Sequence, residues 1–543
     1  MFSVTRASRR AEPIFCSTNP MNFESILFRD GAERARSEKQ TQAPDYFVDL
    51  NIDQIIAALI SSKSDYNLLP FFYAPLHDVD SVHFRHEVMH DLENPRLLHA
   101  VKAFAQSMQT VRAHLSELEK RYYEHQNERW FLDAVDLYCD AVGRLAEDLR
   151  AEHCRSRGFQ AFRDYLADYV ASPRFTALIA EAKRLKAELA AIRYSIFIYG
   201  SHVEVHHYAD NPDYGAEIAA TFERFRQGAA QGYAFRFFDS TEMDQVEAKI
   251  LDGVAYLHKE TFESLKNFRA NNADFLDQTL VAFDREIQFY IAYLDYIAPL
   301  KDAGLAFCYP HLSISDKEVY DEAGFDLALA GKLVPKGIVP VCNDFYLKDP
   351  ERIIVVSGPN QGGKTTFART FGQLHYLAGL GLPVPGRHAQ LYLPDRIFTH
   401  FEREEKMTNR RGKLEDDLVR IHEILEAATP RSLIIINEIF ASAAFQDALF
   451  LSKKIATKIT ELDTLCVWVT FIDEIASLSR KTVSMVSTVV PNNPAQRTFK
   501  ILRRPADGLA YAMSIAEKHR LTYHMILERT RRESTSALPQ PGL

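Results

Sequence analysis

The feature that most constrains this chain is a glycine-rich segment that follows a short apolar run. The run is Ile353–Val356, and residues 357–366 then read Ser-Gly-Pro-Asn-Gln-Gly-Gly-Lys-Thr-Thr. A helical pattern, Phe367–Leu377, comes directly afterwards. A buried strand, a G-x-x-x-x-G-K-T loop and a helix in this order form a phosphate-binding loop. The sequence therefore predicts a P-loop nucleotide-binding domain in the C-terminal part of the chain.

Each residue type in this loop suits a nucleoside triphosphate. Glycines let backbone N–H groups turn toward the β-phosphate, and the helix N-terminus adds partial positive charge. Lys364 is expected to reach the β and γ oxygens, and Thr365 to offer its hydroxyl to Mg²⁺. The expected ligands are therefore ATP and Mg²⁺. The candidate nucleotide-binding residues of the loop are Gly358, Pro359, Asn360, Gln361, Gly362, Gly363, Lys364, Thr365 and Thr366.

A second apolar run, Ser432–Ile436, is followed by Asn437 and Glu438. A Walker B segment has this form, with an aspartate where this chain has Asn437. A neutral amide can still hydrogen-bond a magnesium-bound water, so Asn437 is a weak metal candidate that lacks the charge that helps to hold the ion. Glu438 stands where a general base would orient the attacking water, and it is the candidate catalytic residue.

Outside these motifs the pattern divides the chain into a helical half and an α/β half. Residues 45–335 read as successive helices rich in Leu, Ala, Glu, Lys and Arg, and residues 336–530 alternate apolar runs with helical segments. From Leu276 to Ile297 apolar residues alternate spacings of four and three. This stripe favours a long helix packed within the chain over an intermolecular coiled coil.

Composition limits the remaining possibilities. Residues 1–44 are expected to be an N-terminal tail and residues 531–543 a disordered tail. No apolar run approaches the roughly 20 residues that a membrane span needs. The six cysteines are scattered, which suits reduced thiols in a cytoplasmic protein. A net charge of −9 gives no overall basic signature, so any DNA contact must come from local patches or from a partner.

The phosphate-binding loop resembles that of one family in detail. Residues 358–366 are similar to the G-P-N-M-G-G-K-S-T loop of MutS proteins. Upstream, Pro340–Asp344 looks like the family's adenine-side segment, which makes Val341 and Asn343 candidate nucleotide-binding residues. Near the end, Asp507–Ala512 is similar to the motif that leads into the family's dimerising helices. More loosely, the helical half resembles the family's core and lever domains.

This resemblance implies a multidomain α and α/β fold, with an all-helical core and lever half followed by a P-loop ATPase domain of the ABC-like MutS type. It also implies a homodimeric, ATP-dependent switch that acts on DNA. Short basic groups, Lys183–Lys186, Arg410–Arg411 and Arg503–Arg504, are candidates for phosphate contacts, but solvated helix faces are the favoured explanation for them.

Several departures from the family pattern bear on activity. Phe440–Ala448 replaces the G-R-G-T-S-T-x-D-G loop that reaches the partner's nucleotide, and Phe471 replaces the histidine that would sense the γ-phosphate. Pro340 stands where an aromatic residue would stack on adenine. The chain contains no Phe-x-Glu, so we expect no mismatch-reading domain. These departures predict a slow ATPase, or alternatively a pseudo-ATPase scaffold that binds ATP and a protein partner.

Overall fold

The computed structural model describes residues 23–118, 123–200, 202–209, 217–218, 221, 243–402, 412–490, 493–506 and 521–527. Its contacts divide the chain into two compact units. The first contains Leu92–Cys154 and Phe159–Asp284, and the second contains Glu24–Asp91, Arg155–Gly158 and the chain from Arg285 onward. None of the helices in these ranges combines the length and the apolar character that crossing a lipid bilayer requires.

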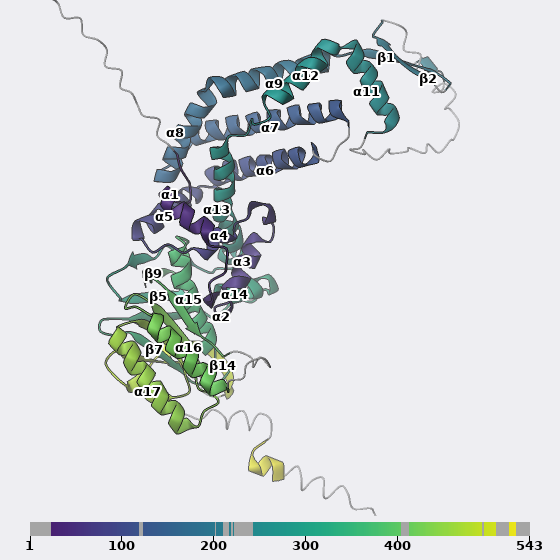
Figure 1. Cartoon of the computed structure of the whole chain (residues 1–543). Coiled ribbons are helices and arrows are strands. Elements are labelled where there is room, and N and C mark those ends of the chain that lie inside the picture. The colour runs from purple at the N-terminus through teal and green to yellow at the C-terminus, as the bar shows by residue number, and fades with distance from the viewer. Residues whose placement is uncertain are drawn as a thin grey trace, which may run out of the picture. The chain divides into compact units, whose positions relative to one another are not determined.

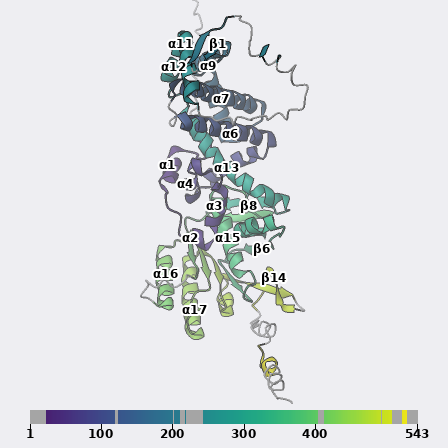
Figure 2. The same cartoon turned by 90° about the vertical axis from the view of Figure 1, so that its right-hand side faces the viewer.

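The first unit is mainly a bundle of long helices, and Figures 1 and 2 show α6 and α7 side by side. Its core is aromatic, with the rings of Phe162 and Phe283 stacked at 3.6 Å. Local signals set the helix starts: Ser172 caps α9 through Phe175 N–H, and Asp244 and Glu247 form a capping box on α11. The helices are α6 (Pro95–Leu118), α7 (Glu124–Ala151), α8 (Arg157–Ala171, which belongs to this unit from Phe159 onward), α9 (Pro173–Ala191), α11 (Gln245–Leu257), α12 (Lys259–Asn271) and the first part of α13 (Gln278–Asp302).

The expectation of an all-helical half is wrong at one place in this unit. Strands β1 (Tyr194–Tyr199) and β2 (His202–His207) form an antiparallel hairpin. The sequence of β1 is Tyr-Ser-Ile-Phe-Ile-Tyr, and aromatic and β-branched residues of this kind favour an extended strand. Val205 of β2 packs with Val254 of α11, so the hairpin buries part of one face.

The apolar stripe is confirmed as a helix packed within the chain. From Leu280 to Ile297 it lies on α13, while Leu276 precedes the helix, and Leu280, Phe283, Ile287, Tyr290 and Ile297 are all buried. The boundary between the two units falls inside this helix, after Asp284.

The second unit contains a six-stranded sheet, in the part of the chain where the sequence predicts an α/β domain. Its strand order is β10-β11-β12-β7-β13-β14, and all neighbours are parallel except the antiparallel pair β13 and β14. The strands are β10 (Ile397–His400), β11 (Leu433–Asn437), β12 (Leu465–Val469), β7 (Ile353–Ser357), β13 (Thr482–Val490) and β14 (Asn493–Arg503). Strands β7, β11 and β12 are buried at every position, as continuously apolar runs between helices require.

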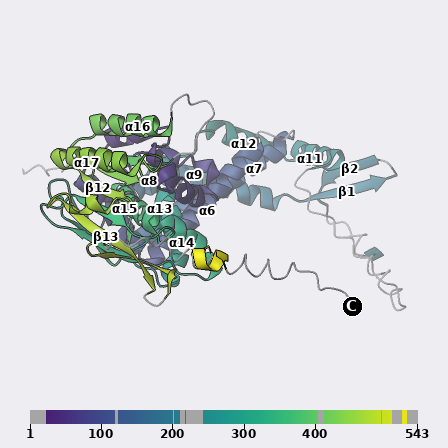
Figure 3. The same cartoon turned by 90° about the horizontal axis from the view of Figure 1, so that it is seen from below.

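Helices cover both faces of this sheet. Ile421 of α16 and Ile455 of α17 join a core with Ile434 and Trp468 of the sheet, whereas Gly372 of α15 packs closely on Ile435, whose side chain points to the opposite face. Figure 3 shows α16 and α17 on one side of the strands and α15 on the other. The helices are α15 (Lys364–Gly379), α16 (Lys413–Ala427) and α17 (Phe445–Leu462).

Smaller elements complete the second unit. Its short sheets are β3 (Phe307–Cys308) with β8 (Val384–Pro385), and β4 (His311–Ser313), β9 (His388–Tyr392), β5 (Val319–Gly324) and β6 (Asn343–Leu347) in that order. Its remaining helices are α1 (Gly31–Lys39), α2 (Tyr46–Asp49), α3 (Ile52–Ile60), η1 (Ser64–Tyr66), α4 (Leu69–Tyr73), α5 (Val79–Leu92), α14 (Leu327–Leu333), η2 (Val334–Lys336) and η3 (Asp473–Ser477).

The expected domain boundaries differ from the structure near the N-terminus. Helix α1 lies within residues 1–44, which were expected to form a tail, and residues 24–91 belong to the second unit and not to a lever domain. The physical reason is that this segment packs on α15. Arg369 Nε donates to the Asp49 carbonyl oxygen at 2.9 Å, and Tyr376 donates to the Phe72 carbonyl oxygen at 2.7 Å. The expected tail at residues 531–543 lies outside the described residues.

Candidate nucleotide-binding site

The phosphate-binding loop joins β7 to α15, and its backbone makes the left-handed turns that glycine permits. The φ angle is +112° at Gly358 and +90° at Gly363. A Cβ atom at Gly362 would lie 2.2 Å from the Ser487 hydroxyl oxygen and 2.9 Å from the Pro359 carbonyl oxygen. The loop therefore needs glycine at these positions to turn its N–H groups inward.

The Lys364 ammonium group is buried at the base of this loop. Its Nζ donates to the carbonyl oxygens of Gly358 and Pro359 at 3.1 Å each, and to Asn360 Oδ1 at 3.3 Å. Burial lowers the pKa of Lys364, while the Glu438 carboxylate, with Oε1 3.8 Å from Nζ, acts to raise it. The loop thus fixes its cation beside the candidate general base.

The end of β11 meets the start of α15 at Thr365. The Thr365 hydroxyl donates to Asn437 Oδ1 at 3.0 Å. Glu438 follows with a φ angle of +56°, and its N–H donates to the Val469 carbonyl oxygen at 2.9 Å. Burial raises the pKa of Glu438, and the Lys364 ammonium group opposes this shift. A hydroxyl, an amide oxygen and a carboxylate are therefore brought together here from two distant segments.

A cavity of about 660 Å³ lies beside the loop, within the range typical of small-molecule sites. Gly358, Pro359 and Asn437 are not among its lining residues; they lie behind it and contact Lys364 and Thr365. The predicted site residues that line the cavity are Val341, Asn343, Asn360, Gln361, Gly362, Gly363, Lys364, Thr365, Thr366 and Glu438.

Phe499 of β14 is a lining residue that the sequence did not single out. Its side chain is 49% exposed, and its backbone adopts a φ angle of +58°. Asn343 holds it in place, because Nδ2 donates to the Phe499 carbonyl oxygen at 3.1 Å and Oδ1 accepts from Ile501 N–H at 2.8 Å. An exposed aromatic ring can stack on a nucleobase, a contact that Pro340 in the same cavity cannot offer.

Phe471 lies on the phosphate side of the site. Its ring centroid is 5.2 Å from Lys364 Nζ, and half of its side chain is exposed. An aromatic face therefore neighbours the lysine, and it offers the terminal phosphate no hydrogen-bond donor.

The oxygen atoms of this site fit Mg²⁺ bound together with a nucleotide. Magnesium takes oxygen ligands, keeps several waters and is bound with substrate phosphates. The adjacent Thr365 hydroxyl and Asn437 amide oxygen suit such a site, with Asn437 acting through water. Among the described residues no group of three or more His, Cys, Asp and Glu side chains could hold a metal ion by itself. Any magnesium here would therefore depend on the phosphates.

The basic groups picked out in the sequence are largely paired within the protein. Arg184 contacts Glu188 at 2.6 Å, Lys186 contacts Asp136, and Arg503 contacts Glu351. The pair Arg410–Arg411 and the segment Asp507–Ala512 lie outside the described residues.

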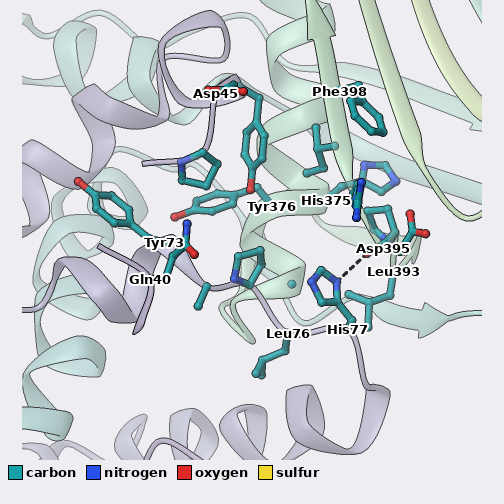
Figure 4. A pocket seen from close by; sticks show the side chains of 18 of the residues that line it. Gln40, Asp45, Tyr73, Leu76, His77, His375, Tyr376, Leu393, Asp395 and Phe398 are labelled. Carbon is teal, nitrogen blue, oxygen red and sulfur yellow. Dashed lines mark hydrogen bonds between the residues drawn. The ribbon is translucent and has the colours of Figure 1, made fainter. Parts of the chain in front are cut away.

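A second cavity, of about 1030 Å³, lies at the other end of α15 (Figure 4). His375, the first residue of α15 that lines it, is about 16 Å along the helix from Lys364, at 1.5 Å per residue. Its polar side chains tie neighbouring segments together: His77 Nδ1 lies 2.9 Å from the Pro394 carbonyl oxygen, and Asp395 accepts from Thr429 and Ser432. We therefore assign this cavity to the packing of residues 24–91 on the sheet domain, separate from the nucleotide site.

A parallel sheet with this loop after β7 and a carboxylate after β11 defines a P-loop nucleotide-binding domain. Residues 354–535 match the family model described as MutS domain V.

Similar proteins agree with this assignment. A DNA mismatch repair protein MutS of Solibacter usitatus is 28% identical over 312 residues, which cover 54% of this chain and 34% of that protein. An Endonuclease MutS2 of Thermus thermophilus is 27% identical over 204 residues, or 37% of this chain and 27% of that protein. The matches thus span about a third of the length of these relatives.

Proposed function

We propose that this chain is a MutS-related, ATP-binding switch that hydrolyses ATP slowly and acts on DNA as a dimer. The observation that carries the proposal is the approach of Thr365 to Asn437 at 3.0 Å, with Glu438 3.8 Å from Lys364. This arrangement provides a phosphate cradle, a metal position and a general base in one cavity.

The parts have distinct roles in hydrolysis. The loop N–H groups and Lys364 bind the β and γ phosphates, and Phe499 and Val341 contact the base. Thr365 and Asn437, the latter through water, would hold Mg²⁺, which would supply positive charge beside the phosphates. Glu438 orients the attacking water and accepts its proton. Its raised pKa, caused mainly by burial, makes it a better proton acceptor than an exposed glutamate.

Two side chains support slow turnover. Asn437 is neutral, so it attracts Mg²⁺ less strongly than an aspartate. Phe471 places a ring where a hydrogen-bond donor to the terminal phosphate would stabilise the transition state. Both substitutions weaken catalysis more than binding, and we expect a turnover below about 1 s⁻¹, the low end of typical enzymes.

Dimerisation and DNA binding rest on the relatives and on the exposed surface. Phe445, the first residue of α17, is 59% exposed, and in the family this segment faces the partner's nucleotide. Two of the relatives are named for DNA mismatch repair or as an endonuclease, which supports DNA as the partner. Because Arg184 and Lys186 are paired with acidic groups, DNA contacts would be made by other basic side chains. Any preference among DNAs would depend on the shape of the DNA and not on its base sequence.

The neutral Asn437 and the ring of Phe471 also favour a second candidate function. A pseudo-ATPase scaffold would bind ATP without significant hydrolysis and would present the helical unit to a protein partner. The two functions differ in one measurable quantity, the part of ATP turnover that depends on Glu438.

The test compares wild type with Glu438→Gln, which keeps the size of the side chain and removes the base. Phosphate release is measured with and without linear and branched DNA, and oligomeric state is followed by light scattering with ATP. The switch predicts a slow wild-type rate that Glu438→Gln lowers at least tenfold, and an ATP-dependent dimer. Equal rates in the two proteins would support the scaffold and contradict the switch.

A further inference from the structure

The chain makes an unusual turn directly after β11. The φ angle is +56° at Glu438 and +64° at Phe440, and neither residue is glycine. A left-handed backbone is unfavourable for residues that carry a side chain, so it persists only where the surrounding structure holds it. Contacts around the turn must therefore fix the direction in which the Glu438 side chain leaves the backbone.

Hydrogen bonds hold the backbone at both ends of this turn. At the first end, Glu438 N–H donates to the Val469 carbonyl oxygen of β12 at 2.9 Å. At the second end, Phe440 N–H donates to Asp417 Oδ2 of α16 at 3.4 Å. The Asp417 carboxylate thus binds the backbone two residues beyond the candidate general base.

The Asp417 carboxylate is itself buried and faces a second polar group. His400, the last residue of β10, is also buried, and its Nε2 lies 3.4 Å from Asp417 Oδ1. Strand β10 pairs with β11, and His400 stands opposite Ile436, so this histidine is fixed next to the Walker B strand. Asp417 does not line the nucleotide cavity. It would therefore act on the site through the turn and not by touching the ligand.

We propose that Asp417 is a positioning residue for ATP hydrolysis, which holds the turn at Phe440 and thereby directs the Glu438 carboxylate at the attacking water. His400 orients the Asp417 carboxylate from its other side. This inference rests on the proposed function and adds to it a residue that does not touch the nucleotide. Without the bond to Asp417, the left-handed backbone at Phe440 would relax and displace Glu438. A displacement of about 1 Å is enough to slow a reaction by about a hundredfold.

The experiment measures ATP turnover and ATP affinity on the full chain with Asp417 replaced by Ala, Leu or Asn. Alanine and leucine both remove the acceptor for Phe440 N–H, and leucine fills the buried space if alanine leaves the protein unfolded. We expect both variants to lower turnover at least about tenfold, with ATP affinity within about twofold of wild type. Asparagine keeps an oxygen acceptor, so Asp417→Asn should stay within about threefold of wild type.

A second arm adds Asp417→Leu to Glu438→Gln. If Asp417 acts through Glu438, the double variant should turn over ATP no more slowly than Glu438→Gln alone, because residues that act as a unit are not additive. A further loss of turnover in the double variant would overturn the proposal, since it would show that Asp417 acts on the fold as a whole. A loss of ATP affinity as large as the loss of turnover would overturn it for the same reason.

The matched control is Glu415→Ala, which removes an exposed carboxylate from the first turn of the same helix and should keep wild-type turnover. Wild-type turnover in Asp417→Leu, together with a slow Glu438→Gln, would overturn this inference alone. Equal rates in wild type and Glu438→Gln would overturn the proposed function and this inference with it, so the two failures are distinguishable.

Discussion

The Thr365 hydroxyl donates a hydrogen bond to the side-chain oxygen of Asn437 at 3.0 Å. Thr365 lies at the start of α15, directly after β7 and its loop, and Asn437 ends β11; β12 lies between β7 and β11 in the sheet. Their contact joins the phosphate-binding loop to the Walker B strand at the point where a nucleotide-bound metal would sit. In the proposed function, this pair would determine how strongly magnesium is held.

Replacing Asn437 with aspartate should leave ATP turnover unchanged or raise it. The carboxylate restores the negative charge that attracts Mg²⁺, so the magnesium concentration for half-maximal turnover should fall. Steady-state phosphate release against magnesium concentration measures both quantities. Asn437→Ala, which removes the oxygen, is the control and should be slower. An Asn437→Asp protein that folds normally but turns over more slowly than wild type would contradict this role.

The pH dependence of turnover should report Glu438. The base must be ionised to accept a proton, and burial raises its pKa above the ordinary value of 4.5. Turnover should therefore fall as pH decreases through a midpoint above 4.5. The residual turnover of Glu438→Gln should not show this decrease at low pH. A wild-type midpoint at or below the ordinary value would argue against Glu438 as a buried base.

Asp463 at the end of α17 should stabilise the fold at neutral pH. Burial tends to raise its pKa, but hydrogen bonds from three cations hold that pKa well below its usual range. The donors are Lys481 at 2.8 Å, Lys317 at 3.0 Å and Arg352 at 3.0 Å. Because the pKa is lower in the folded state, the stabilisation is complete above the unfolded value and is lost as pH falls through the folded one.

Asp463→Asn keeps the shape and tolerates the left-handed backbone, where φ is +56°. We expect it to lower the free energy of unfolding by about 1–2 kcal/mol at pH 7, a figure reduced because the carboxylate is partly exposed. Urea denaturation measures this loss, which should persist at pH 5 and shrink below about pH 4. An equal loss at every pH would show that the charge is not responsible.

The affinity for DNA should fall steeply with salt and should be nearly the same for paired and mispaired duplexes. Mismatch recognition uses an apolar wedge that enters a kinked step, and this sequence contains no Phe-x-Glu that would supply one. Contacts to phosphates alone give a steep salt dependence. A competition at fixed salt between a perfect duplex and the same duplex with a G·T pair tests this. A preference above about tenfold for the mispair would show that a reading element exists.

The sequence was most informative where structure depends on neighbouring residues. Strand β7, the loop and α15 follow from one continuous segment, and β11 and β12 follow from apolar runs of strand length. The aromatic and β-branched residues of Tyr194–Tyr199 are an equally local signal for a strand, but they stand within a region whose overall pattern predicts helices.

The remaining features depend on contacts between distant segments. Short helices near the N-terminus give no local sign that Asp49 and Phe72 will bind the side chains of α15. Phe499 is 156 residues from Asn343, which holds it, and Arg497 is 137 residues from the carbonyl group that it contacts. No spacing rule within one segment could have placed Phe499 at the nucleotide cavity or Arg497 against the phosphate-binding loop.

The most direct test of the account is an ATP titration of wild type and Lys364→Ala by calorimetry. Lys364 is buried at the base of the loop, where we propose that its ammonium group binds the β and γ phosphates. We expect one ATP bound per wild-type chain and a loss of affinity of at least about a hundredfold in Lys364→Ala, or about 2.7 kcal/mol. Lys453→Ala, an exposed lysine of α17, is the control and should bind as wild type does. Equal ATP affinity in Lys364→Ala and wild type would contradict the assignment of this cavity to nucleotide.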